Sequence, residues 1–154
     1  MSAGTLNQWK QSGLLYFWRY TENVRNYPGW HLAADEAGLA ALTDLLRRLL
    51  GADDSAMRTT KISPPSPVVL ATANNRRSPV VSPERVSWTV SATDNDWHFD
   101  ERGPVLAFRL GRHKVARMLQ WLSDPDRAFD TTYGTSPPIW FWGTIVAAQH
   151  RIGR

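Results

Sequence analysis

The histidines of this 154-residue chain are its most direct candidates for acid–base or metal chemistry. His31 lies four residues before Asp35, and His98 lies two residues before Asp100 in a segment with strand character. Two such ligands are too few for a metal site without partners from distant segments. We therefore expect His31 and Asp35 to cap a helix or lie on the surface, and we assign His98 no metal or catalytic role.

Acidic side chains between residues 94 and 101 raise the question of a calcium loop. The segment fails the EF-hand pattern, because Phe99 stands where the sharp turn needs glycine and no bidentate acid follows at the correct position. We expect a solvated turn that accepts a cation or a basic partner. Its acidic members are Asp94, Asp96, Asp100 and Glu101.

The chain lacks the sequence signatures of the common catalytic and nucleotide sites. It has no cysteine, which excludes disulfides, thiolate metal sites and thiol catalysis. It also has no nucleophile elbow, phosphate-binding loop, dinucleotide-binding turn or zincin helix. We expect no cofactor, no metal and no catalytic residue. One enzymatic alternative stays open, in which His98, Asp100 and Glu101 converge with other segments in a deep pocket.

Basic residues are concentrated in the middle of the chain. The formal net charge is +4, and residues 58–92 hold five basic side chains against one acidic one, Glu84. This is a mild excess, less dense than in a dedicated nucleic-acid-binding domain. A second basic group lies on the predicted helix 112–122, where a solvated helix face is the simpler interpretation. The five basic residues of the middle segment are Arg58, Lys61, Arg76, Arg77 and Arg85.

Two aromatic runs near the chain ends are the strongest candidates for a binding surface. Leu14–Tyr20 places Trp18 and Tyr20 on one strand face, and Ile139–Trp142 places Trp140 and Trp142 on one face of another strand. The core has room for all eight tryptophans, since folding buries about 17,000 Å² and eight such rings take up about 1,200–2,000 Å². Both strands are aromatic on two faces, however, and helices on one side of a sheet can cover only one of them.

What lies over the second aromatic face then decides between scaffold and binding site. Either the proline-rich segment 62–83 and the loop 126–138 fold over it, or a partner covers it, because an exposed apolar face of this size is rare on a monomer. The partner-binding residues that follow from the second alternative are Trp18, Tyr20, Trp140, Trp142, Arg76 and Arg77.

Two helices and about six strands are expected to position these residues. Leucines at helical spacing predict a helix over about 35–50 that ends at Gly51, and apolar residues at the same spacing predict a second over about 112–122. Extended segments are predicted near 13–20, 58–62, 68–73, 85–90, 104–110 and 139–146. This order predicts a single α+β domain over residues 1–154, with an antiparallel or mixed sheet of about five to six strands and two packed helices. Residues 1–12 are expected to be a polar N-terminal segment, and residues 149–154 a frayed basic tail.

The functional hypothesis is a non-enzymatic protein-binding module. The chain is small, free of cysteine, rich in aromatic residues and without catalytic signatures. In these features it is similar to small bacterial binding proteins such as toxin-neutralising immunity proteins. The partner would be another protein, as a heteromer or a homodimer. The alternative is a single-stranded nucleic-acid-binding domain that stacks bases on its rings and contacts phosphates with its basic loop. No signal peptide or membrane span is expected, and the predicted location is the cytoplasm.

Overall fold

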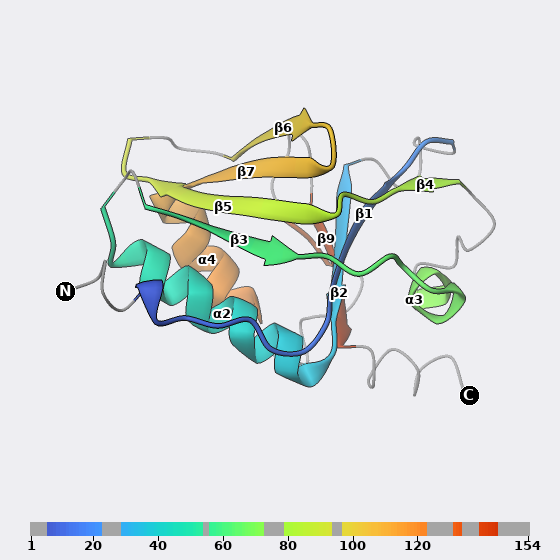
Figure 1. The fold of residues 1–154 in the computed structure, drawn as a ribbon, viewed down its shortest axis with the longest axis horizontal. Helices are drawn as coiled ribbons and strands as arrows, with labels where there is room; N and C mark the ends of the chain where they lie inside the picture. The colour runs from blue at the N-terminus through green and yellow to red at the C-terminus, as the bar shows by residue number, and fades with distance from the viewer. Residues whose placement is uncertain are drawn as a thin grey trace.

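Two β-sheets and two long helices enclose the main apolar core in the computed structural model (Figure 1). The structure describes residues 6–22, 29–53, 56–72, 79–93, 97–122, 131–133 and 139–144. The α+β class and the two packed helices are confirmed. The strands, however, are divided between two mixed sheets rather than joined in one.

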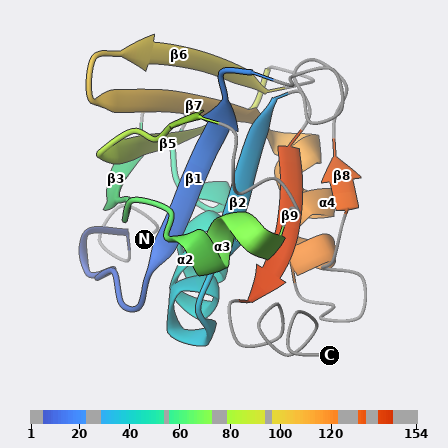
Figure 2. The same ribbon diagram turned by 90° about the vertical axis from the view of Figure 1, so that its right-hand side faces the viewer.

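The larger sheet has five strands in the order β4-β1-β2-β9-β8. Its two aromatic strands are not direct neighbours, because β2 lies between them and pairs antiparallel with β1 and parallel with β9 (Figure 2). The five strands are β1 (Leu15–Tyr20), β2 (Trp30–Ala34), β4 (Val80–Val81), β8 (Thr131–Tyr133) and β9 (Ile139–Thr144).

The smaller sheet has four strands in the order β3-β5-β7-β6. Its two central strands are parallel, and both edge strands pair antiparallel with them. Gly103, at a positive φ of 63°, and Pro104 form the tight turn between β6 and β7. The strands are β3 (Met57–Lys61), β5 (Arg85–Ser91), β6 (His98–Arg102) and β7 (Val105–Gly111).

Helices α2 (Glu36–Leu50) and α4 (Arg112–Leu122) lie side by side beneath the smaller sheet (Figure 1). The predicted ends of α2 are confirmed. Asp35 caps its start, since the carboxylate accepts the Gly38 N–H at 2.7 Å. Gly51 follows its last residue, and the Gly51 N–H donates to the Arg47 carbonyl at 3.3 Å. The Asp35 carboxylate also accepts the Leu14 N–H at 2.9 Å, so one side chain ties the start of α2 to the segment that enters β1.

The strand predicted for residues 68–73 is wrong, because this segment holds the short helix α3 (Pro67–Thr72). Its two adjacent valines favoured a strand by propensity, but the local start signal is helical. Pro67 occupies the first helical position, where its missing N–H costs nothing. The Ser66 hydroxyl accepts the Val69 N–H at 3.3 Å, as a helix N-cap does.

Three strands were not predicted, namely β2, β4 and β8, while the strand character expected around His98 and Asp100 is confirmed by β6. β2 gave no alternating pattern because all five of its residues are buried, and its position just before α2 suggested a helix entrance. β4 and β8 have only two and three residues, too few for a periodic signal.

The segment before β1 contributes to the core although it was expected to be polar. Leu6 and Trp9 are buried, and the Trp9 indole N–H donates to the Ala41 carbonyl at 2.9 Å. Residues 1–5 and the predicted tail 149–154 lie outside the described residues.

Candidate binding surface

Helix α3 covers part of the second aromatic face of the larger sheet. It lies in front of β1, β2 and β9 in Figure 2, and its Val69 and Leu70 belong to the apolar cluster that contains Trp18 and Tyr20. Only 0 % of Trp18 and 2 % of Tyr20 is exposed to solvent. The segment 62–83 thus supplies part of the cover, and these two rings stabilise the domain. In this conformation a partner could reach neither ring.

His31 lies inside this face rather than on the surface, so its expected surface or capping role is wrong. It is fully buried between two indoles from the neighbouring strands. Its ring stacks on Trp18 at 5.4 Å and on Trp140 at 5.9 Å, while Tyr20 meets it edge-on at 4.9 Å. The strand register explains the stack, since Trp18, His31 and Trp140 are direct cross-strand partners.

The remaining predicted partner-binding residues are only partly described. Trp140 is half-buried at the margin of the same cluster. The backbone of Trp142 belongs to β9, but its side chain lies outside the described part of the structure. Arg76 and Arg77 also lie outside the described residues. Of the six, Trp140 alone is both described and partly accessible.

One carboxylate influences the tyrosine at the start of this face. Tyr16 is nearly buried, and the pKa of its hydroxyl is raised above its ordinary value. Burial is the larger cause, and the negative charge of Asp35 is the second. Tyr16 therefore keeps its proton at neutral pH.

The smaller sheet presents a face that no described helix or strand covers (Figure 1). Its other face carries Trp88 and Phe108 into the main core. Side chains alternate across a strand, so the register places twelve residues outward in three rows of four. The rows, from β3 to β6, are Lys61–Arg85–Val105–Arg102, Thr59–Ser87–Ala107–Asp100 and Met57–Thr89–Arg109–His98.

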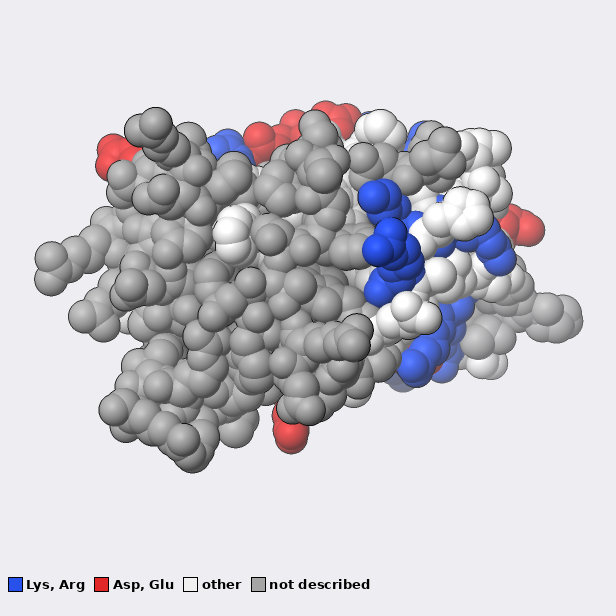
Figure 3. All heavy atoms as spheres, turned by 180° about the vertical axis from the view of Figure 1, so that it is seen from behind, with Lys and Arg blue, Asp and Glu red and all other residues white. Residues whose placement is uncertain are grey.

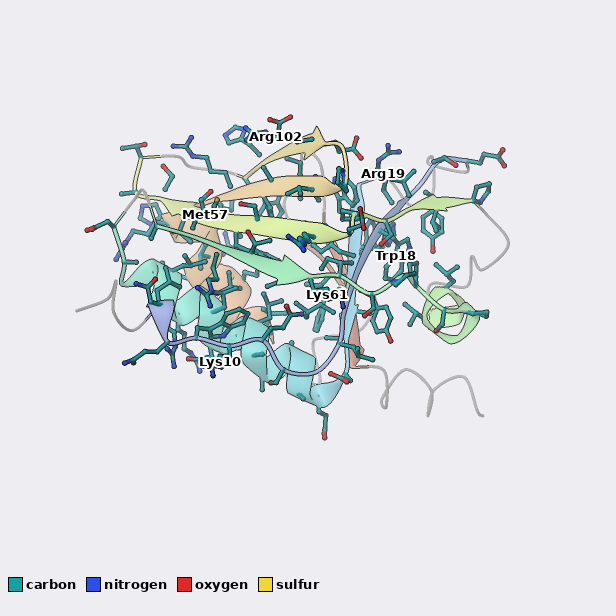
Figure 4. All side chains as sticks on the ribbon, in the orientation of Figure 1. Lys10, Trp18, Arg19, Met57, Lys61 and Arg102 are labelled. Carbon is teal, nitrogen blue, oxygen red and sulfur yellow. The ribbon has the colours of Figure 1, made fainter. Side chains whose placement is uncertain are left out.

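Basic side chains outnumber acidic ones on this face, which we call the open face. Lys61, Arg85, Arg102 and Arg109 are exposed there, and Asp100 is its single acidic residue. Asp100 is paired with Arg102 at 2.7 Å. Lys61 stands directly opposite Arg85, and like charges in this position repel each other. Figure 4 shows Lys61 near one corner of this sheet and Arg102 on the far edge strand.

The centre of the open face is made of short side chains. Ser87, Thr89, Val105 and Ala107 are partly exposed on the two central strands. None of the twelve outward residues is Phe, Tyr or Trp, and the one aromatic ring among them is the imidazole of His98 on edge strand β6. The surface of a partner can therefore approach the centre of this face closely, while the longer basic side chains lie around the contact area.

Helix α4 forms a second basic region on the opposite side of the molecule. Figure 3 shows Lys and Arg side chains gathered on the side where α4 and α2 lie. Arg112, His113 and Arg117 are exposed, which agrees with the solvated face expected for this helix. Lys114 packs its ammonium group over Trp97 at 5.9 Å, and Lys114 and Arg117 each have a further interaction partner. Arg109 of the open face also has a further interaction partner. A charged solvent face is, however, usual for an amphipathic helix, so we regard this region as the weaker candidate.

The residues of the enzymatic alternative do not converge. His98 and Asp100 point outward from edge strand β6, and Glu101 points to the other side, where it binds Arg19 at 2.9 Å. Asp94 and Asp96 of the acidic segment lie outside the described residues. Among the described residues no three histidine or carboxylate side chains gather as a metal site.

An open recess lies beside β3, at the edge of the open face. It has a volume of about 500 Å³ and is polar over most of its lining. Residues 9–11 form one side and residues 57–59 the other: Trp9, Lys10, Gln11, Met57, Arg58 and Thr59. No pattern in the sequence pointed to this recess, because its two sides are about fifty residues apart in the chain.

Comparison with known proteins gives no match to a family model, a curated protein or a solved structure. Among the described residues, no helix has the length and apolar character needed to cross a membrane.

Proposed function

We propose that this protein is a non-enzymatic protein-binding module that holds an acidic partner protein on the open face. The observation that supports it is that the open face is both predominantly basic and left uncovered by the described part of the chain. The open face has four basic side chains and one acidic one, and no described element lies over it. Complementary charge gives such a surface its specificity and a fast association rate.

The make-up of the open face favours a protein over single-stranded nucleic acid. Binding of single strands relies on aromatic side chains on which successive bases stack. The outward residues include no Phe, Tyr or Trp, and their one imidazole, that of His98, lies on an edge strand. Among the tryptophans whose side chains are described, only Trp140 is partly exposed, and it belongs to the larger sheet. A toxin-neutralising role is one form that such a module can take, with an acidic toxin as the partner.

A charge-reversal experiment tests the proposal. We expect the double variant Lys61→Glu, Arg85→Glu to lose the partner that the wild-type protein captures from its native host. The matched control is Arg47→Glu, Arg112→Glu, which changes the net charge equally at exposed positions of α2 and α4. Equal loss of the partner in both variants would mean that overall charge, and not the open face, controls binding.

The nucleic-acid alternative is tested with the same proteins. Labelled single-stranded and duplex oligonucleotides are titrated at low salt, with fluorescence anisotropy as the readout. Binding that weakens steeply with salt and disappears in the Lys61→Glu, Arg85→Glu variant would replace the acidic protein with a nucleic acid as the ligand.

A further inference from the structure

β3 is an edge strand whose outer backbone groups follow from the register. The Ile62 N–H donates to the Glu84 carbonyl at 2.9 Å, and this pair continues the β3–β5 register by one residue. In an antiparallel pair, hydrogen-bonded positions alternate with non-bonded ones. Thr60 and Arg58 therefore bond to β5, while Lys61, Thr59 and Met57 direct their N–H and C=O groups away from it.

A side chain already occupies one of these outward positions. The Gln11 side-chain amide donates to the Lys61 carbonyl at 2.8 Å, and its oxygen accepts the Lys61 N–H at 2.7 Å. A glutamine thus takes the place of a neighbouring strand at the end of β3. Toward the start of β3 the N-terminal segment does not pair with the strand. The Arg58 side chain reaches across the space between them, and its guanidinium donates to the Trp9 carbonyl at 2.7 Å.

The recess begins next to the Gln11 side chain, beside the part of β3 that this side chain does not pair with. Met57 and Thr59 line it, and Met57 is 56 % exposed, the highest value among the large apolar side chains described. An edge strand with outward backbone groups and an exposed apolar side chain is a template for another strand. The volume of about 500 Å³ lies within the range of about 300–1,000 Å³ that is typical of ligand sites.

We propose that an extended, acidic segment of the partner adds to β3 as a further strand, with its backbone bonded to Thr59 and Met57. This inference rests on the proposed function and names the way in which the partner is held. Cations flank the position of the added strand: Lys61 on the open face, and Lys10 on the opposite wall of the recess. Strand addition supplies affinity through the main chain, and the flanking charges select the side chains.

The same charges argue against a second copy of this chain as the occupant. Two β3 strands paired in antiparallel fashion would join two open faces, each with four basic side chains and one acidic one, into one continuous surface. Surfaces of the same net charge repel each other. An acidic segment avoids this repulsion and forms ion pairs instead.

The probe is a labelled seven-residue peptide of alternating glutamate and valine, with a lysine-for-glutamate version as its control. We expect the acidic peptide to bind, as measured by fluorescence anisotropy, and to slow amide hydrogen exchange at Met57 and Thr59. Thr59→Pro removes the outward N–H without breaking the β5 ladder, and we expect it to weaken binding about tenfold. Thr59→Val retains the N–H and is the matched control.

Gln11→Ala provides a second variant that leaves β3 unchanged. It frees the Lys61 backbone groups, so the added strand gains one more bonded position and the acidic peptide should bind several-fold more tightly. Equal binding by wild type, Thr59→Pro and Gln11→Ala would overturn strand addition and leave charge attraction alone. Loss of the natural partner in Lys61→Glu, Arg85→Glu, with no peptide binding at all, would overturn this inference while the proposed function stands.

Discussion

The two sheets of this molecule use their faces in opposite ways. The larger sheet has aromatic rings on both faces; the main core covers one of them, and α3 covers the part of the other that holds Trp18 and Tyr20. The smaller sheet has Phe and Trp rings on one face only, and its other face carries short side chains with cations around them. Phe, Tyr and Trp side chains therefore mark buried surface in this chain, and the face that no described element covers has none of them.

The largest expected difference between the two sheets is in stability. Trp18→Ala removes a fully buried ring from the covered face and should lower the free energy of unfolding by about 3–5 kcal/mol. Arg85→Gln on the open face should change it by no more than about 0.5 kcal/mol, because exposed substitutions rarely do more. Urea unfolding at neutral pH measures both. A small loss for Trp18→Ala would show that α3 does not hold that face closed in solution.

A second prediction concerns the contact that anchors the larger sheet to α2. A Cβ added at Gly38 would lie 2.1 Å from the Leu14 carbonyl oxygen, so the helix and the segment entering β1 could not keep their present approach. Helix propensity alone would favour alanine by about 1 kcal/mol. We expect Gly38→Ala instead to cost about 1–3 kcal/mol, as overpacking does.

The control for this prediction is Ala40→Gly at an exposed position of the same helix. It should cost about 1 kcal/mol through propensity alone. A stabilised Gly38→Ala variant would mean that the close approach of α2 to residue 14 is absent in solution.

A third prediction compares one buried tryptophan from each sheet. The Trp88 indole N–H donates to the Thr60 hydroxyl at 2.8 Å, whereas the Trp18 indole N–H has no hydrogen-bond partner among the described residues. Phenylalanine removes the N–H from both. Trp88→Phe should therefore be more destabilising than Trp18→Phe by about 0.5–1.5 kcal/mol, the net contribution of one hydrogen bond, since the Thr60 hydroxyl keeps its bond to the Val86 carbonyl at 3.5 Å. Equal losses, measured by chemical unfolding, would point to a hydrogen-bond partner for Trp18.

These differences also show what could be predicted from the sequence. Both long helices and the strand over 85–90 were predictable, because their apolar residues recur with one period. The strands over 13–20 and 139–146 were predictable from continuous aromatic and aliphatic runs, and those over 58–62 and 104–110 from their extended character. The alternation of Arg85, Ser87 and Thr89 correctly indicated one polar face on β5. The matching outward residues of β7 include Val105 and Ala107, which hid the open face in the sequence.

The cover over the aromatic face and the recess could not be predicted, for a different physical reason. Both depend on contacts between segments that are far apart in the chain. α3 contacts β1 across about fifty residues, and Gln11 meets Lys61 at a separation of 50. Local periodicity carries no information about such pairs. The sequence could identify the two alternatives for the aromatic face but not choose between them.

The smallest expected effect concerns the ion pair that links the two sheets. Arg19 on β1 donates to both carboxylate oxygens of Glu101 on β6, at 2.9 and 3.3 Å, and its guanidinium lies 5.7 Å from the centre of the Trp30 ring. Both side chains are partly exposed, so a double-mutant cycle with Arg19→Gln and Glu101→Gln should give a coupling of only about 0.2–1 kcal/mol. That coupling should fall as salt is added. A larger, salt-insensitive coupling would mean that this ion pair holds the two sheets together. A weak coupling would mean that buried rings hold them together instead. Phe17 is one such ring, and its centre lies 6.1 Å from that of Phe108 on the smaller sheet.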